Sequence, residues 1–283
     1  MSSHHNSLRW RSGVNLVVIA AALVAITVIT NAYSFNLMLR NFRQSLSSTA
    51  LIYTEQISGK VDKINSGSLE LVSLAASSQN YYTSSPLGRY LTQQDILTRL
   101  QDRIRYVESS DLYFFYRTDS DELLTALSNR ASTGSSYFWN QYLMLPPTQP
   151  ANTWFSVTCN GETWLMCYYN VSQVRVGAAV RAKTLLQSLY ADTGLVQDSG
   201  FALAGLDGTI VYSSQPDLMA CGTSLAGHIP ASLIVESHTV PEVGTLLLFR
   251  PSSDLLHQLS GSFGWLLLLN LLALALITTM LLN

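Results

Sequence analysis

The sequence is short of charged residues. Only 12% of its 283 residues are charged, while 48% are hydrophobic; soluble domains carry about 25% charged residues. The formal net charge is -2, so the chain lacks the basic excess that nucleic-acid-binding domains carry. The shortage has its source in two charge-free stretches, one near each end. The composition therefore predicts a protein that contacts the lipid bilayer and has no nucleic-acid partner.

Signatures of catalysis and metal binding are also lacking. The three cysteines, at positions 159, 167 and 221, have no C-x-x-C spacing, and we expect free, partly buried thiols. No two of the five histidines are four residues apart, the spacing of a helical metal site. The G-x-S-x-G, Walker and G-x-G-x-x-G motifs are absent. We therefore expect no enzyme activity in this chain, no cofactor and no metal.

The two charge-free stretches are long enough to cross a bilayer. The first is residues 14–35, between Arg11 and Arg40, and the second is residues 261–283, after Asp254. About 20 apolar residues with a helical rise of 1.5 Å span the hydrocarbon core. The alternatives are buried core helices or, for the first stretch, a cleaved signal peptide. We favour two spanning helices, because core helices are amphipathic and signal peptides have shorter apolar runs.

Basic residues beside the first stretch predict its orientation. Arg9 and Arg11 precede it and favour a cytoplasmic N-terminus, residues 1–13. Arg40 and Arg43 follow it and weaken this assignment. Two spans would return the C-terminus to the cytoplasm. We therefore expect a multi-pass membrane protein whose central part, about residues 34–262, is extracytoplasmic.

A long helical pattern, residues 36–80, follows the first stretch. Apolar residues recur there at alternating steps of three and four, the spacing of one helix face: Phe42, Leu46, Ala50, Tyr53, Ile57, Val61, Ile64, Leu71 and Ala75. Gly59 and Gly67 weaken the helix slightly. This face could pack on the chain's own domain or against a second copy, and the two are compatible. The pattern predicts a stalk helix and allows a homodimer.

The middle of the chain alternates helix and strand patterns. A helix is expected after Ser85, then strands at 112–117 and 123–127. Asn160-Gly161 is a strong hairpin turn signal, and it pairs Val157 with Trp164 and Phe155 with Met166. A strand at 174–180 leads into a helix at 182–191. A smaller unit follows, with strands at 201–206, 209–213, 232–239 and 244–249. The pattern predicts an α+β fold with antiparallel sheets.

Four segments carry a resemblance to a known family: DLYFFYRTDSDELLTA, VRVGAAVRAKTLLQSL, GFALAGLDGTIVYSS and LLLFRPSSDLL. Their order resembles the double Cache, PAS-like, sensor region of bacterial membrane receptors, closest to YesM-like sensor histidine kinases. The resemblance implies a membrane-distal module at 81–195 and a membrane-proximal module at 196–260. It also implies small-molecule sensing at the bacterial cell membrane, a dimer, and signalling through a two-component pathway with a kinase and a response regulator.

Two departures from the family limit what carries over. Many such modules end the distal sheet with a Gly-Val-x-Asp-like run, whereas residues 176–181 here read VGAAVR, without the acid. Amino-acid-binding members carry Arg two residues before a Trp; Trp139 lacks it, so an amino-acid ligand is not supported. The sequence ends at Asn283 without the family's output domain. We expect a truncated gene product or a receptor that acts through a partner.

The resemblance places the ligand in the distal module, between its sheet and the overlying loops. It implies a ligand site of five residues: Arg117, Tyr137, Trp139, Tyr168 and Arg175. For each aromatic residue, a place in the hydrophobic core is the simpler alternative. Arg117 is the most informative, because a buried guanidinium needs an acceptor. A ligand carboxylate could supply it, and so could Asp119 or Asp121.

Two other functions stay open beside sensing. One is a surface enzyme, which the missing catalytic constellation disfavours. The other is a membrane-anchored structural or assembly partner of another membrane protein. Asn270 in the second apolar stretch is a candidate for a polar contact between helices, which the partner hypothesis would favour.

Overall fold

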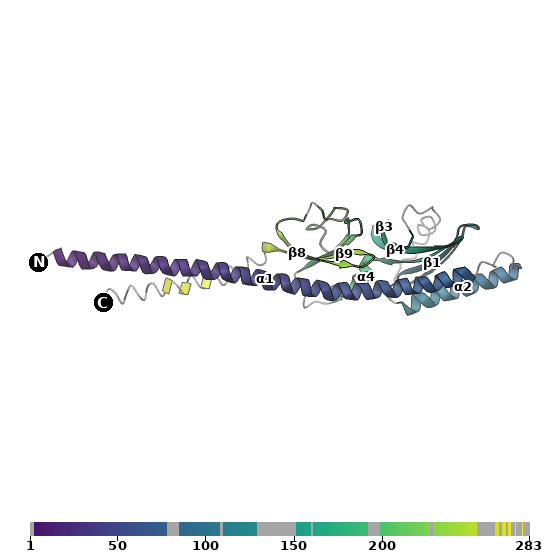
Figure 1. Ribbon diagram of the computed structural model, residues 1–283, viewed down its shortest axis with the longest axis horizontal. Helices are drawn as coiled ribbons and strands as arrows, with labels where there is room; N and C mark the ends of the chain where they lie inside the picture. The colour runs from purple at the N-terminus through teal and green to yellow at the C-terminus, as the bar shows by residue number, and fades with distance from the viewer. Residues whose placement is uncertain are drawn as a thin grey trace. The chain divides into compact units, whose positions relative to one another are not determined.

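The computed structural model describes residues 3–77, 85–107, 110–128, 151–159, 161–191, 199–226 and 229–253, together with residues 264, 265, 268, 269, 271, 272, 275 and 279. The fold is α+β, with a long N-terminal helix and two antiparallel sheets, as predicted (Figure 1). The chain divides into two compact units. The smaller is Met1–Leu46, Ala231–Ile234 and Arg250–Asn283, and the larger is Ser47–Pro230 and Val235–Phe249.

The long helix α1, Ser3–Ser77, begins with an apolar part. Among the described residues it is the one helix long and apolar enough to cross a membrane, over Val17–Ala76. Large apolar side chains near its start are exposed, for example Val18, Val24, Ile29 and Tyr33. This agrees with the first predicted span. The second, at 261–283, lies largely outside the described residues, and so does Asn270.

The predicted stripe on the stalk part of α1 is confirmed. Eight of its apolar residues are buried: Leu46, Ala50, Tyr53, Ile57, Val61, Ile64, Leu71 and Ala75. Three apolar residues off this stripe, Leu51, Ile52 and Leu69, are exposed. The helical period therefore separates one face of α1, which packs on the chain's own fold, from another that does not.

Helix α2, Pro86–Tyr106, starts with a serine cap. The Ser85 hydroxyl accepts a hydrogen bond from the Gly88 amide at 3.3 Å, and Pro86 occupies the first turn. Both features favour helix initiation. Ile96 and Leu100 are buried on one face of the helix. An ion pair joins Arg103 of α2 to Glu70 of α1.

The larger sheet has five strands in the order β2-β1-β5-β4-β3. They are β1 Leu112–Arg117, β2 Glu122–Leu127, β3 Phe155–Cys159, β4 Glu162–Val171 and β5 Val174–Arg181. All neighbouring pairs are antiparallel. Phe155 pairs with Met166 and Val157 with Trp164, which confirms the predicted hairpin register. Gly161 has φ of 77°, as its turn requires.

The smaller sheet has four strands in the order β7-β6-β9-β8. They are β6 Gly200–Gly205, β7 Ile210–Ser213, β8 Leu233–Val240 and β9 Gly244–Pro251. The predicted strands have the same order and differ by up to two residues at their ends. Between the sheets lie two short helices, α4 Ala182–Leu185 and α5 Gln187–Ala191. The sequence predicted one helix there; a tight turn from the Leu189 amide to the Leu186 carbonyl interrupts it.

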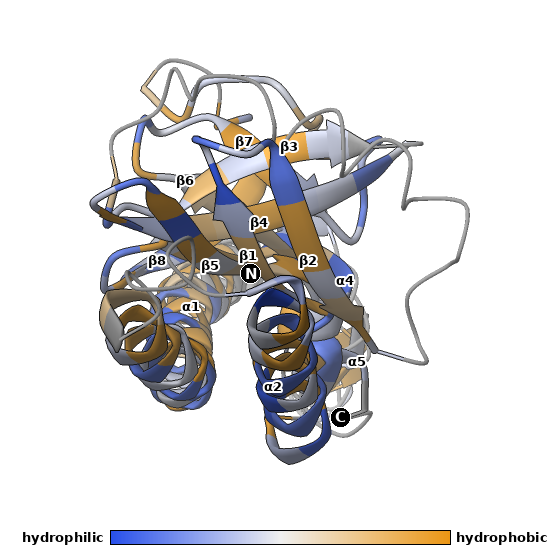
Figure 2. Cartoon of the chain, turned by 90° about the vertical axis from the view of Figure 1, so that its right-hand side faces the viewer, coloured by the Kyte–Doolittle hydropathy of each residue, from blue (hydrophilic) through white to orange (hydrophobic). Residues whose placement is uncertain are grey.

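Helices α1 and α2 lie along one face of the five-stranded sheet (Figure 2). Tyr113 of β1 reaches α1, where its hydroxyl donates to the Ile64 carbonyl at 3.4 Å. A Cβ added at Gly67 would lie 2.5 Å from that hydroxyl. Gly67 therefore gives Tyr113 the space to pack, which accounts for a residue that otherwise disfavours helix.

Candidate functional site

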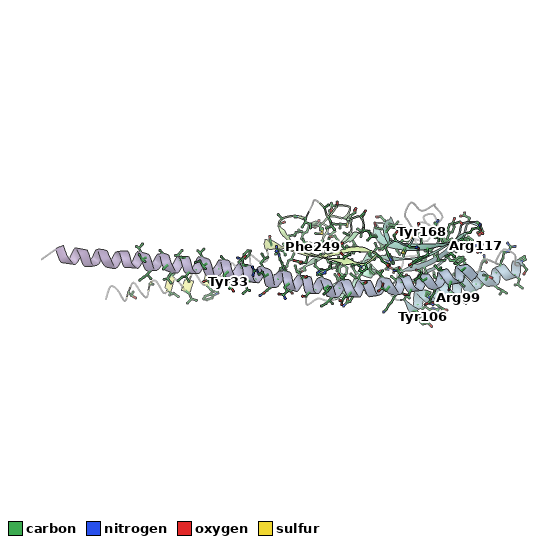
Figure 3. The ribbon with its side chains drawn as sticks, in the orientation of Figure 1. Tyr33, Arg99, Tyr106, Arg117, Tyr168 and Phe249 are labelled. Atoms are coloured by element: carbon green, nitrogen blue, oxygen red, sulfur yellow. The ribbon has the colours of Figure 1, made fainter. Side chains whose placement is uncertain are left out.

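Side chains of β1 alternate between the two faces of the five-stranded sheet, as strand geometry requires. Tyr113 points to the helices, and by alternation Phe115 and Arg117 are on the same face of the sheet. Phe114 and Tyr116 point to the opposite face. Figure 3 labels Tyr168 on that opposite face and Arg99 and Tyr106 on α2. Helices α1 and α2 cover one face of this sheet, so we look for a ligand site on the opposite face.

The opposite face holds a buried aromatic cluster, here called the sheet-face cluster. Its members come from β1, β4 and β5: Leu112, Phe114, Tyr116, Trp164, Met166, Tyr168 and Ala179. Phe155 and Ala151 are half-buried against it. The rings of Phe155 and Tyr168 meet edge to face, with centroids 6.0 Å apart. Most small-molecule sites are apolar and use few polar groups to orient the ligand.

Arg175 of β5 supplies a cation on this face. Its guanidinium carbon lies 5.2 Å from the centroid of the Tyr168 ring and 5.6 Å from that of Tyr116. Both distances suit a cation–π contact. The residue is only 8% exposed, and this burial lowers the pKa of the Arg175 guanidinium. Tyr168 and Arg175, both predicted site residues, are therefore brought together.

The two tyrosines beside Arg175 differ in their hydroxyl contacts. Tyr116 donates a hydrogen bond to Oδ1 of Asp121 at 2.8 Å. Burial raises the pKa of Tyr116, and the Asp121 bond raises it further. Burial also raises the pKa of Tyr168, while nearby Arg175 lowers it. Both phenols are therefore neutral near pH 7 and available as hydrogen-bond donors.

Gly177 separates these rings along β5. It pairs with Phe114 of β1 and Tyr168 of β4. A Cβ there would clash with the Cys167 carbonyl and lie 2.9 Å from Cζ of Phe114. The glycine thus lets the Phe114 ring of β1 and the Tyr168 ring of β4 approach each other across β5.

Arg117 was the most informative of the predicted site residues. By alternation along β1, its side chain is on the same face of the sheet as Tyr113, the face that the helices cover. It is 5% exposed and forms a two-pronged ion pair with Asp119, through Nε at 3.2 Å and Nη2 at 2.9 Å. This is the alternative acceptor that the sequence offered. The structure does not bring Arg117 together with Tyr168 and Arg175. Tyr137 and Trp139, the remaining predicted members, lie outside the described residues.

A second arginine, Arg181, lies at the other end of β5. Its guanidinium carbon is 5.7 Å from the Trp164 ring, and Nη2 donates to Oδ1 of Asp111 at 3.0 Å. Hydrogen bonding to Asp111 raises the pKa of Arg181. Asp111 is fully buried and also accepts from Ser128. Residues 176–181, VGAAVR, lack the acidic residue that ends the corresponding run in double Cache modules. In this chain the carboxylate of Asp111, just before β1, lies beside Arg181, the last residue of the run.

Sequence reasoning missed Tyr116, Asp111 and Arg181. The sequence shows that side chains alternate along β1, but it does not show which face of the sheet the helices cover. The pairing of Asp111 with Arg181 joins residues 70 positions apart, and no local pattern signals it.

The described part of the chain holds two free thiols that differ in exposure. Cys167 is a buried free thiol, and burial raises its pKa to about 12. Cys221 is a free and exposed thiol. The side chain of Cys159 lies outside the described residues. Among described residues, no group of three or more His, Cys, Asp or Glu side chains is placed to hold a metal ion.

Comparison with solved structures identifies the fold of this chain. No family model matches the sequence, and no curated protein matches it. The structure is similar to the periplasmic sensory domain of the Campylobacter jejuni chemoreceptor Tlp1, with a TM-score of 0.51 and 11% identity over 77% of this chain and 97% of that one. The ligand-binding domain of C. jejuni chemoreceptor Tlp3, in complex with L-valine, has a TM-score of 0.47 and 9% identity over 80% of this chain and 98% of that one. The periplasmic domain of Vibrio cholerae LuxQ has a TM-score of 0.40 and 12% identity over 74% of this chain and 99% of that one. The chain has the fold of a bacterial periplasmic sensory domain.

Proposed function

We propose that this chain senses a small molecule outside the bacterial cytoplasm and transmits the signal across the membrane. The observation that carries the proposal is the continuity of α1. One helix contains the exposed apolar part near Val18 and also the buried stripe beneath the five-stranded sheet. Through Ile64 and Gly67 it contacts Tyr113, which stands on the same strand as Tyr116. A shift of β1 on ligand binding would therefore act directly on α1.

The proposed ligand site lies on the sheet face, around Tyr116, Tyr168 and Arg175. A guanidinium flanked by two phenol rings recognises an anionic group, because Arg donates two parallel hydrogen bonds to a carboxylate. The proposed ligand is thus a small molecule that carries a carboxylate or similar anion beside an apolar part. Tyr137 and Trp139 stay predicted members of the site. Arg117 is left out of it, since Asp119 holds its guanidinium and its parity directs it to the other face.

The proposed output is a two-component pathway, with this chain as the input part of a sensor histidine kinase system. The proposal includes a second membrane span at 261–283 and a homodimer. A ligand that binds one conformation better would shift the population of the dimer, and the helices would carry that shift inward.

The test begins with the full chain in dodecyl maltoside micelles. Thermal unfolding is measured with acetate, lactate, succinate, benzoate and, as a neutral comparison, glucose; a compound that binds the folded state raises the unfolding temperature. The best compound is then titrated into wild type, Arg175→Gln and Arg117→Gln. We expect Arg175→Gln to weaken binding about 10- to 100-fold, since a hydrogen bond to a charged group contributes about 1.5–3 kcal/mol.

Arg117→Gln is the matched control, because both arginines are buried and lie on neighbouring strands. It should bind the compound as wild type does. Equal losses in the two variants would remove the sheet-face site from the proposal. Stabilisation by glucose and by none of the acids would contradict the anionic ligand while leaving sensing itself in place.

A further inference from the structure

A cavity lies at the edge of the five-stranded sheet, where β3 meets the β6–β7 turn. Its volume is 260 Å³, and its lining comes from both sheets: Thr153, Trp154, Phe155, Ser156, Leu165, Gly205, Leu206, Asp207 and Val243. Figure 2 shows β3, β6 and β7 on the side of the fold away from α1 and α2. With about 30 Å³ of liquid volume for each water, it has room for about nine water-sized groups. That suits a small organic molecule.

The cavity has an apolar floor and a partly polar rim. Trp154, Leu165 and Val243 are buried and form the floor. Ser156, Leu206 and Asp207 are exposed and form the rim. A buried apolar floor with a few polar groups at the mouth is the usual build of a small-molecule site.

Asp207 is the one ionisable residue among the described residues of this lining. Its side chain is fixed by the turn that follows: Oδ1 accepts the Thr209 amide at 3.0 Å, and Oδ2 accepts the Thr209 hydroxyl at 2.9 Å. Each carboxylate oxygen can accept a further hydrogen bond. The carboxylate is therefore held in place and still able to bind a donor.

The floor is connected to α1 by side-chain hydrogen bonds. Trp154 Nε1 donates to Oδ1 of Asn65 at 3.2 Å, and Asn65 Nδ2 donates to Glu242 at 2.7 Å. Glu242 precedes Val243 of the floor. Phe155, which also belongs to the lining, contacts the Tyr168 ring. An occupant of the cavity thus touches residues held by the stalk helix and by the sheet-face cluster.

We propose that this cavity is a second ligand site, which binds a small organic cation such as a primary or quaternary amine with an apolar group. The carboxylate of Asp207 offers the counter-charge, and the buried Trp154 offers an aromatic ring, the combination that recognises organic ammonium ions. The cavity has the negatively charged Asp207, whereas the sheet face has the positively charged Arg175, so the two sites are expected to bind ligands of opposite charge.

The test uses the full chain in dodecyl maltoside micelles and two probes of one shape, benzylammonium and neutral benzyl alcohol. Ligand-observed NMR titrations follow both. Wild type should bind benzylammonium saturably. Asp207→Asn preserves the turn and removes the charge, and we expect it to weaken benzylammonium about fivefold or more while leaving benzyl alcohol unchanged. Asp217→Asn, an exposed carboxylate of the same module outside the lining, should change neither.

A second variant tests the cavity itself. Ser156→Phe places a ring at the exposed rim and should abolish binding of both probes, with the unfolding temperature unchanged. Arg175→Gln should leave benzylammonium binding intact, which separates this site from the sheet face. The proposal is overturned if wild type shows no saturable binding, if Ser156→Phe binds as wild type does, or if Asp207→Asn and Asp217→Asn behave alike.

Discussion

Tyr113 on the first strand of the five-stranded sheet donates its hydroxyl hydrogen to the Ile64 carbonyl of the long helix α1, across 3.4 Å. That helix carbonyl also accepts a hydrogen bond from the Ser68 hydroxyl at 3.1 Å. Tyr113 is fully buried, and burial raises its pKa above the ordinary value for tyrosine. The phenol therefore stays protonated and remains a donor to α1 throughout the neutral range.

Replacement of Gly67 by alanine should destabilise the fold. The new methyl group would meet the Tyr113 hydroxyl at 2.5 Å, and overpacking of a buried site costs about 1–3 kcal/mol. Gly59→Ala on the same helix is the control. Nothing lies within 4 Å of its added Cβ, so the gain in helix propensity of about 1 kcal/mol should stabilise the fold. Chemical unfolding of the full chain measures both, and a gain in Gly67→Ala would contradict the packing argument.

The stalk stripe and the β3–β4 register could be predicted from sequence because both depend on local repeats. A step of three or four residues identifies the buried face of α1 at Ile57 and Ile64, and one Asn-Gly turn fixes the pairing of Phe155 with Met166. The candidate site could be predicted only in part. A period of two shows that Arg117 and Tyr116 point to opposite faces, but not which face the helices cover. That is decided by contacts between residues distant in sequence.

Asp111→Asn should lower the free energy of unfolding by about 3 kcal/mol, the usual loss when one partner of a buried ion pair is removed. Asp111 is fully buried and binds the Arg181 guanidinium and amide. The control is Asp95→Asn, whose carboxylate pairs with Arg99 on the exposed surface of α2. Such pairs contribute about 0.5 kcal/mol or less. Similar losses in the two variants would show that Asp111 does not act as a buried charge.

Cys167 should resist thiol reagents while Cys221 reacts. Burial raises the Cys167 pKa to about 12, so its reactive thiolate is scarce at pH 8, whereas Cys221 is exposed. In a Cys159→Ser background, Ellman's reagent should modify one thiol in the folded chain and a second only after denaturation. Fast modification of two thiols in the folded chain would contradict the burial of Cys167.

The raised pKa of Cys167 also gives a pH dependence. Its folded value of about 12 lies above the ordinary value of 9.0, so folding favours the neutral thiol. This contribution to stability is complete below about pH 9 and is lost as the pH rises toward about 12. Cys167→Ala should therefore show a shallower loss of unfolding free energy over that range than wild type. Parallel curves for the two proteins would refute this linkage.

The proposed homodimer should be detectable by crosslinking at the exposed face of α1. Ile57 is completely buried against the chain's own fold, whereas Ile52 is 52% exposed. In membranes, with Cys159 and Cys221 replaced by serine, Ile52→Cys should form a disulfide-linked dimer under mild oxidation. Ile57→Cys should stay monomeric, although the stripe alone made it an equally good dimer contact. A dimer trapped through position 57, or monomer at both positions, would contradict association through the face of α1 that carries Leu51, Ile52 and Leu69.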